Sequence, residues 1–327
     1  MTVQRLKILT FNHHESFLWA LGKTGHDFDV VERYGQLDLG WNSAARPRPR
    51  NFTPVAFDAR VRAKLMRGEY DLVVTHTIKN LLWLAPHFRS RFVFVAHIPL
   101  FFNSPLAALK SWFKKMVFLV FRATHRTRLV AVSEFKRRSW GVSGVTQVLT
   151  PAEVPGLKAG QGYDRIIIVC NNLAGRREEL GLGMIQELAA ELPIQIIGNN
   201  PGIDGSLRPE GFANFQELLT RARIYLYTIR QPWGDGYNTA MLEAMAMGMA
   251  VVTVANPSSP IQHGVNGLVG HHAGELKEHL RFLLDHPEVV DRLGSAAQKT
   301  IEQCFSMSTF VSGWERIFAD VVAGDSL

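Results

Sequence analysis

Two acidic residues separated by seven positions, Asp235 and Glu243, form the pattern with the most direct chemical use in this 327-residue sequence. They lie in the run WGDGYNTAMLEAMAMG, where a helix is predicted to begin near Asn238. The N-terminus of a helix directs free N–H groups and a positive dipole end at whatever lies before it, and a diphosphate suits that position. Within the helix, the Glu243 carboxylate suits the paired hydroxyls of a ribose. Asp235, in the loop, suits the hydroxyls of a sugar.

Gly236 follows the first acid, and a residue without a Cβ lets the backbone pass close to a ligand. The alternative is an ordinary capped helix whose acids are solvated, because two acids at this spacing also occur by chance. The sequence around the two acids is therefore needed to distinguish a binding site from an ordinary capped helix.

Apolar runs typical of strands alternate with helical patterns along the chain, which predicts a parallel α/β architecture. Two prolines and three glycines in residues 151–162 indicate a linker between two series of elements. We expect two doubly wound domains, residues 1–155 and 156–327, with an interdomain cleft. The expected strands are 6–11, 28–31, 71–75, 92–96, 129–132, 165–170, 194–197, 224–227 and 250–254, and the expected helices include 15–23, 183–191, 215–221 and 238–247.

The run from Gly211 to Gly270 resembles the C-terminal domain of the large retaining glycosyltransferase family that includes sucrose synthases and relatives of glycogen synthase. That family has two Rossmann-like domains, the GT-B architecture, and a Glu-x7-Glu motif followed by Ala-Met-Ala and a glycine. Here the motif corresponds to Asp235-x7-Glu243 and the AMAMG that follows. Residues 261–269 are similar to the nucleotide-side loop of the family, and residues 130–136 to the segment that closes its N-terminal domain.

The resemblance implies a metal-independent hexosyltransferase of glycan biosynthesis that needs no cofactor. It would move a sugar, from a UDP-sugar rather than a GDP-sugar, to a hydroxyl on a lipid-linked or anionic glycan. Glu243 would hold the ribose and Asp235 would act at the donor sugar. The backbone of Gly236, Tyr237 and Asn238 would line the phosphate and sugar.

In the first half of the chain, His97 matches a family histidine that faces the transferred sugar. The alternative for His97 is a buried histidine with satisfied hydrogen bonds, and His76 is a weaker candidate. His13 and His14 stand on the acceptor side, in a loop that lacks the paired glycines of the family. By the same resemblance, the last helix, residues 310–322, crosses back to brace the first domain.

The family also has an arginine and a lysine after the first strand of its second domain, which neutralise the diphosphate. Asn171 replaces the arginine here, and Arg176 or Arg177 supplies the second charge. Arg230 is a possible substitute for the lost cation. The missing cation and glycines favour an alternative, a degenerate subunit that binds a nucleotide-sugar without catalysis.

The net charge of +7 divides unequally, into +14 for residues 1–150 and −7 for residues 151–327. An anionic partner for the first half is therefore expected. Ser111 to Arg128 combines apolar and basic residues, which suits an anionic membrane surface, and the alternative is a core helix. No nucleic-acid-binding motif is visible. We expect a cytoplasmic protein, peripheral on the inner face of the cell membrane, with Cys170 and Cys304 as free thiols.

Two other enzyme classes are less well supported. Asp27-Phe28-Asp29 begins a strand rather than ending one, which argues against the metal-dependent, single-domain glycosyltransferase fold. A nucleotide-sugar epimerase of the same two-domain build would need active-site acids that the sequence does not reveal.

Overall fold

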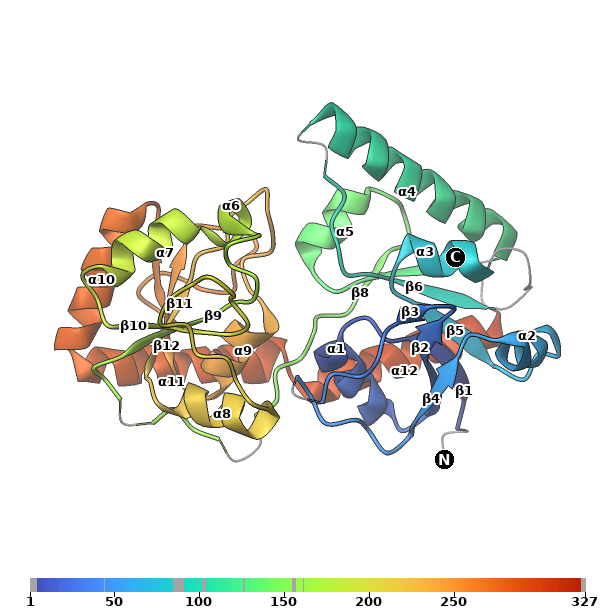
Figure 1. The fold of residues 1–327 in the computed structure, drawn as a ribbon, viewed down its shortest axis with the longest axis horizontal. Helices are drawn as coiled ribbons and strands as arrows, with labels where there is room; N and C mark the ends of the chain where they lie inside the picture. The colour runs from blue at the N-terminus through green and yellow to red at the C-terminus, as the bar shows by residue number, and fades with distance from the viewer. Residues whose placement is uncertain are drawn as a thin grey trace. The chain divides into compact units, whose positions relative to one another are not determined.

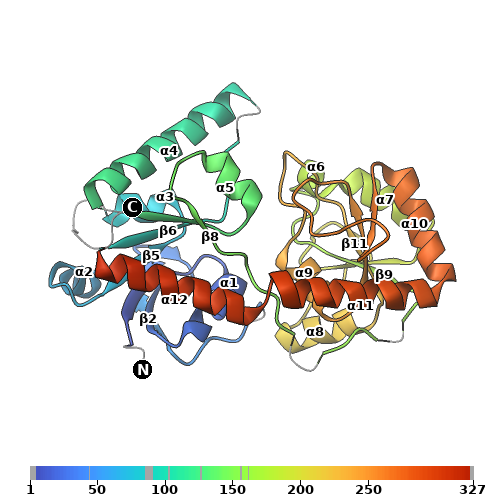
Figure 2. The same cartoon turned by 180° about the vertical axis from the view of Figure 1, so that it is seen from behind.

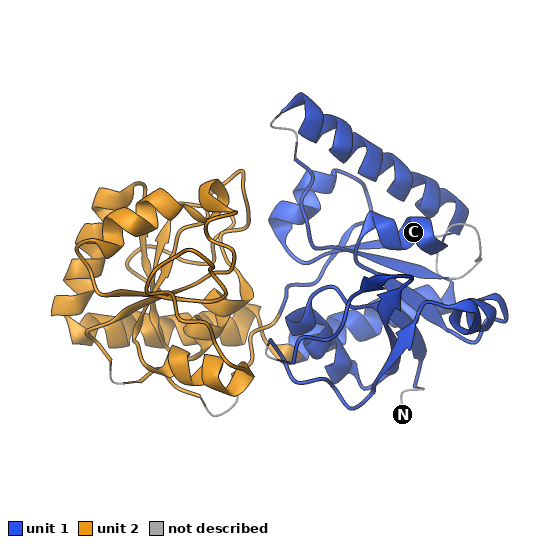
Figure 3. Ribbon diagram, viewed as in Figure 1, with its two compact units in different colours: residues 1–150, 308–327 blue, residues 151–307 orange. Residues whose placement is uncertain are grey.

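The computed structural model describes residues 5–43, 45–84, 91–101, 104–125, 127–154, 157–160 and 162–324. The chain forms two compact units, one of residues 1–150 and 308–327 and the other of residues 151–307 (Figure 3). The change from the first unit to the second falls between Thr150 and Pro151, where the segment rich in proline and glycine begins. Residues 155 and 156, where the sequence analysis places the boundary, lie outside the described residues.

Unit 1 contains an eight-stranded sheet in the order β3-β2-β1-β5-β6-β7-β8, with β4 also paired to β2 (Figure 1). Its pairs are parallel except β2 with β3. The central strands are buried on both faces, which explains their continuous apolar sequences. The strands are β1 (Lys7–Phe11), β2 (Asp27–Tyr34), β3 (Leu37–Asp38), β4 (Phe52–Ala56), β5 (Leu72–Thr75), β6 (Phe92–Ala96), β7 (Arg128–Ala131) and β8 (Thr146–Gln147).

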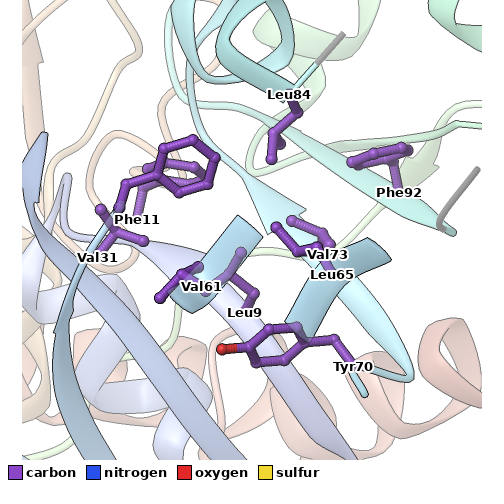
Figure 4. Close-up of a cluster of buried hydrophobic side chains, with 10 residues drawn as sticks. Leu9, Phe11, Val31, Val61, Leu65, Tyr70, Val73, Leu84 and Phe92 are labelled. Carbon is purple, nitrogen blue, oxygen red and sulfur yellow. The ribbon is translucent and has the colours of Figure 1, made fainter. Parts of the chain in front are cut away.

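Helices cover both faces of this sheet. Side chains of α2 and α3 pack against β1, β5 and β6 on one face, in the cluster shown in Figure 4. On the other face, α12 packs on α1, with the Phe17 ring 5.8 Å from those of Phe310 and Trp314. The helices are α1 (Glu15–Leu21), α2 (Ala59–Met66), α3 (Ile78–Leu84), α4 (Pro105–His125), α5 (Glu134–Trp140) and α12 (Met307–Ala323).

Unit 2 contains a five-stranded sheet in the order β10-β9-β11-β12-β13, and all its pairs are parallel. In chain order this is 2-1-3-4-5, a doubly wound arrangement. The strands are β9 (Ile166–Val169), β10 (Ile194–Ile197), β11 (Ile224–Tyr227), β12 (Ala250–Val254) and β13 (Leu268–Gly270).

The helices of unit 2 also cover both faces, with α9 and α11 together on one of them (Figure 2). Gly294 allows this approach, since a Cβ there would lie 1.9 Å from the Gly248 carbonyl oxygen. The helices are α6 (Arg177–Leu180), α7 (Leu182–Ala189), α8 (Phe212–Thr220), α9 (Thr239–Ala246), α10 (Ala273–Asp285) and α11 (Pro287–Cys304).

The α/β class predicted from the sequence is confirmed, and every strand expected by residue range is present. Two expectations need correction. The basic helix expected over residues 111–128 begins earlier, at Pro105, and ends at His125, while Arg128 belongs to β7. Alternating arginines and prolines in residues 45–50 predict an exposed basic loop, because proline suits neither a helix interior nor a central strand. Within this loop, however, Arg46 is only 6% exposed. No helix in the described part of the chain is long and apolar enough to cross a membrane.

Candidate active site

The sheet of unit 2 has a topological switch point between β9 and β11, because β10 lies beyond β9 and β12 beyond β11. Ligands of open α/β sheets bind outside the carboxyl ends of the strands at such a point. Asn171 follows β9 there, and the loop of residues 228–238 follows β11 and leads into α9. The topology therefore directs most of the predicted donor residues to one edge of the sheet.

Helix α9 begins as the sequence predicts. The Asn238 side-chain oxygen accepts a hydrogen bond from the Met241 N–H at 2.8 Å, which caps the helix. Asp235, Gly236 and Tyr237 precede this cap directly. The start of α9 thus has the positive dipole end that favours a phosphate.

The loop before α9 is held by polar residues that follow β12. The Ser258 hydroxyl accepts a hydrogen bond from the Gly236 N–H at 2.8 Å, and the Asn256 amide donates to the carbonyls of Ile229 and Gly234, each at 3.2 Å. Sequence reasoning missed Asn256 and Ser258. These two polar residues follow a buried strand directly, and that position could have identified them, because ligands bind at the carboxyl ends of the strands of a parallel sheet.

Gly236 is required by a close approach within the protein itself. A Cβ at this position would lie 2.3 Å from the Ser259 backbone nitrogen and 2.5 Å from its Cα. The sequence predicts that a ligand passes close to this glycine, whereas the nearby Ser259 backbone already requires a residue without a Cβ here.

Both acids of the predicted motif are buried, Asp235 at 8% and Glu243 at 3% exposure. The Tyr227 hydroxyl donates a hydrogen bond to the Asp235 backbone carbonyl at 3.0 Å, which ties the acid to the end of β11. Carboxylate oxygens accept hydrogen bonds, and the hydroxyls of a sugar or ribose are donors of the matching kind. The two acids therefore have chemistry that suits sugar or ribose binding.

The cations near β9 differ in their surroundings. Arg176 pairs with Glu179 and lies close enough to Cys170 and Tyr227 that these groups contribute to raising its pKa, after the larger effect of Glu179. The Thr228 hydroxyl donates to the Leu180 carbonyl at 2.6 Å, which holds the end of α6 against the end of β11. Arg176 is therefore placed at the switch point.

The other two positions are less suited to neutralise a diphosphate. The Arg177 side chain is 69% exposed and lies 3.9 Å from Glu178. The Asn171 side-chain oxygen accepts from the Asn199 N–H at 2.7 Å, so it joins the loops after β9 and β10 and carries no charge.

Unit 1 has its own switch point, between β1 and β5. His13 and His14 follow β1, His76 follows β5, and His97 follows β6, the next strand along. The His13 ring lies 5.4 Å from that of His97 and 6.0 Å from that of His76. The histidines predicted separately from the sequence thus form one cluster with His76.

A hydrogen-bonded row runs through this cluster. The Thr10 hydroxyl lies 2.9 Å from His76 Nε2, and His76 Nδ1 lies 3.0 Å from His97 Nε2. The edge of the His97 ring packs on Phe17, with the ring centroids 4.7 Å apart. These contacts fix the orientation of the His97 ring. The hydrogen-bonded row uses its Nε2 and does not use its other ring nitrogen, Nδ1.

Burial lowers the pKa of His76 and of His97 well below 6.5, and the neighbouring imidazoles lower both further. The His13 and His14 side chains keep exposed surface, and the surrounding protein still lowers the pKa of both, that of His14 to about 4. A neutral imidazole has one ring N–H that donates and one ring nitrogen that accepts a hydrogen bond, so the cluster suits hydrogen bonding to a sugar.

Polar groups surround the histidines. The Asn12 side-chain oxygen is buried without a hydrogen bond, while its NH₂ group donates to the carbonyls of Leu39 and Gly40. Arg46 and Lys136 lie close enough to His14 to lower its pKa by their charge. Burial lowers the pKa of Arg46 to about 10. Glu15 acts in the opposite direction and raises the pKa of both His13 and His14. Groups of both charges therefore lie around the exposed histidines, which suits a hydroxyl-rich acceptor.

The described residues contain no group of three or more His, Cys, Asp or Glu side chains placed to hold a metal ion.

Comparisons with known proteins agree with this geometry. Residues 184–286, from within α7 to the end of α10, match the family model described as glycosyl transferases group 1. A search of curated proteins finds no match.

Solved structures match over nearly the whole chain. A sucrose-phosphate synthase from Thermosynechococcus elongatus has a TM-score of 0.70 at 12% identity, over 98% of this chain and 100% of that chain. The Anabaena protein HepE in complex with UDP-glucose has a TM-score of 0.71 at 15% identity, over 98% and 100%. A TarM mutant from S. aureus in complex with UDP has a TM-score of 0.61 at 14% identity, over 76% and 55%.

At these identities the structural matches establish the fold. The protein has the GT-B fold expected from the sequence, with two Rossmann-like units. The match of residues 184–286 supports the expected family for the segment that carries Asp235 and Glu243. Retention of configuration, metal independence and the roles of single residues stay predictions.

Proposed function

We propose that this protein is a retaining, metal-independent hexosyltransferase that moves a sugar from a UDP-sugar to a hydroxyl acceptor. One observation carries the proposal: a buried acid, Asp235, precedes α9 and a second, Glu243, lies in its second turn at the switch point of unit 2, inside the segment that matches group 1 glycosyl transferases. The structural neighbours HepE and TarM are described in complexes with UDP, which supports UDP as the nucleotide.

In this proposal the donor is held by unit 2. The N–H groups at the start of α9 and the Arg176 guanidinium bind the diphosphate, because both present positive charge at the same sheet edge. Glu243 accepts hydrogen bonds from the ribose hydroxyls, and Asp235 accepts them from the transferred sugar. The hydrogen bonds from Asn256 and to Ser258 keep the loop in place without donor.

The reaction breaks the bond between the anomeric carbon and the diphosphate oxygen, whose electron pair leaves with UDP. The acceptor oxygen forms the new bond on the same face of the sugar, and its proton passes to the departing phosphate oxygen. The positive groups around the diphosphate stabilise the charge that develops there, which is the main contribution expected of a protein without a metal ion.

We assign His97 to hydrogen bonding with the transferred sugar, and His76 to positioning His97 through its Nδ1. His13 and His14 lie on the acceptor side. The acceptor we propose is a lipid-linked or anionic glycan, since residues 1–150 carry a net charge of +14. We further propose a cytoplasmic location, peripheral on the inner face of the cell membrane.

Calorimetric titration with UDP and with GDP, first without metal and then with Mg²⁺, tests the donor site. We expect UDP to bind without metal, and Glu243→Gln to weaken that binding at least about tenfold, as expected when hydrogen bonds to a charged group are lost. The matched control is Glu178→Gln, which removes an acid whose side chain is 79% exposed. Binding that requires Mg²⁺, or equal UDP affinity in both variants, would contradict the assignment.

A second candidate is a degenerate subunit that binds the nucleotide-sugar without transferring the sugar. The observation that favours it is Asn171, whose side chain links two loops where the family has an arginine. Release of UDP from UDP-glucose, in the presence of acceptor candidates or of water alone, separates the two functions. Tight UDP binding with no release under any condition would favour the non-catalytic subunit.

A further inference from the structure

We propose that α4 docks the protein on an anionic lipid surface, with the helix lying along that surface. The proposal goes beyond the transfer reaction and does not depend on it, because lipid binding can be measured without donor or acceptor. It rests on an unusual distribution of apolar side chains around α4, which the sequence alone did not resolve.

One face of α4 is part of the core of unit 1. Its buried residues Phe118 and Phe121 belong to a cluster with side chains of β6, β7 and α5. The Phe118 ring lies 5.8 Å from Phe94 and 5.7 Å from Trp140. Ser111 continues this face, and its hydroxyl exchanges hydrogen bonds with the Phe101 backbone. This accounts for the core role considered for the segment.

The opposite face of α4 is also apolar, and it is exposed. Five of its large side chains recur at intervals of three or four residues, which places them on one stripe of the helix, and Trp112 borders it. Figures 1 and 2 both show α4 along the outside of unit 1. The exposed fractions are 61% for Leu106, 62% for Leu109, 58% for Trp112, 53% for Phe113, 39% for Met116 and 55% for Val120.

The charges on α4 are all positive. Residues 105–125 contain four lysines and arginines and no aspartate or glutamate. Lys110 is exposed and lies beside the stripe, four residues after Leu106 and three before Phe113. Lys114 follows one turn later on the same flank. Lys115 and Arg122 lie nearer the buried face of the helix, where they donate to the carbonyls of Gly141 at 3.2 Å and Ser143 at 2.8 Å. Lys110 and Lys114 therefore border the apolar stripe on one side.

This arrangement fits an interface between water and anionic lipid. Apolar side chains enter the acyl region, a tryptophan suits the headgroup level, and flanking cations meet anionic headgroups. A second copy of the chain fits less well, because a symmetric pairing of α4 helices would bring lysines together without acids on the helix to offset them. Arg128, which the sequence analysis included, lies 3.4 Å from Asp320 and is not part of this surface.

Vesicle co-sedimentation tests the proposal, with vesicles of phosphatidylcholine alone or mixed with phosphatidylglycerol. We expect the protein to bind the mixed vesicles, and to bind them less as salt is raised. Leu109→Ser combined with Phe113→Ser should lower the partition coefficient by on the order of tenfold or more, since exposed apolar side chains lose their burial in lipid. Lys110→Glu should lower binding to the mixed vesicles by on the order of tenfold, with little effect on neutral ones.

Met66→Ser is the matched control, because Met66 is 73% exposed on α2 of the same unit. It should bind vesicles like the unchanged protein, and UDP affinity should be the same in all variants if they fold. If neither the unchanged protein nor any variant binds UDP, the proposed donor site is wrong. The result of the vesicle experiment would still hold, because it does not depend on UDP. Failure to bind either vesicle would overturn the docking proposal. So would a dimer, seen by light scattering, that the Leu109 and Phe113 substitutions dissociate.

Discussion

Lowering the pH from about 7 to about 5 should destabilise unit 1 through its buried histidine pair. His76 is 3% exposed and hydrogen-bonds both to Thr10 and to His97. Burial and neighbouring imidazoles hold the pKa of His76 and of His97 well below 6.5. Both rings therefore stay neutral in the folded protein at a pH where the unfolded chain protonates them.

The expected loss of stability follows from that difference. Below a pH of about 6.5, each further unit lowers the free energy of unfolding by about 1.4 kcal/mol for every histidine that stays neutral in the folded state. At about pH 5 the loss is roughly 2 kcal/mol for one ring and roughly 4 kcal/mol for both. Above the pKa of histidine in the unfolded chain, the pair does not lower the free energy of unfolding. As the pH falls, the loss stops growing once the pH reaches the pKa values that the two histidines have in the folded protein.

Hydrogen exchange in increasing urea, followed on peptides from β1 and β5, measures the stability of unit 1 separately from that of unit 2. His76→Asn keeps a polar atom near His97 and removes one titrating group. Its free energy of unfolding should fall by about 1.4 kcal/mol less per pH unit between about pH 6.5 and about pH 5, which is the share of one histidine. His13 and His14, whose pKa values are also lowered, contribute equally in both proteins. His271→Asn is the control, because it removes an exposed histidine of unit 2.

The same slope in His76→Asn and in the unchanged protein would refute the reasoning, since it would mean that His76 binds its proton equally well in both states. A slope that drops in the His271→Asn control would refute it too, because the pH dependence would then come from elsewhere.

Three further predictions concern packing, the donor loop and thiol reactivity. Trp314→Ala should lower the free energy of unfolding of unit 1 by about 3–5 kcal/mol in urea titrations, because Trp314 is fully buried, and Trp233→Ala at a 38% exposed site should cost much less. Gly236→Ala should weaken UDP binding by on the order of tenfold in calorimetry, since its Cβ would meet the Ser259 backbone at 2.3 Å and displace the loop; unchanged affinity would contradict this. Native protein should react with one equivalent of a disulfide reagent, at the exposed Cys304, because Cys170 is buried and burial raises its pKa to about 11; two rapid equivalents would contradict this.

The strands of the two sheets could be predicted because their sequences are continuous apolar runs, as in β9 and β12. Strand β4 was missed because it contains Pro54 and alternates poorly, which is tolerated since it pairs only with β2. The start of α9 was predictable for a local reason, the asparagine cap. Local signals of this kind do not require knowledge of the neighbouring strands.

The histidine row shows what the sequence could not provide. Thr10, His76 and His97 lie on three segments that are adjacent only because β1, β5 and β6 are neighbours in the sheet. Two interpretations of His97 remained open in the sequence, a sugar-facing residue or a satisfied buried one. The structure shows a ring that is partly buried and hydrogen-bonded through Nε2, with a second nitrogen that the row does not use.

The same topological rule accounts for the placement of functional residues in both units. In each sheet the strand order reverses beside the first strand of the unit, β1 or β9, and polar residues gather at the carboxyl ends on either side. The sequence shows polar residues after strands in many places, including Asn12, Asn171 and Asn256, and cannot say which strands are adjacent. Some of these serve the loops themselves, as Asn171 and Asn256 do through their hydrogen bonds. Position at a switch point therefore selects the candidates, and the hydrogen bonds of Asn171 and Asn256 then identify these amides as residues that hold the loops around the site.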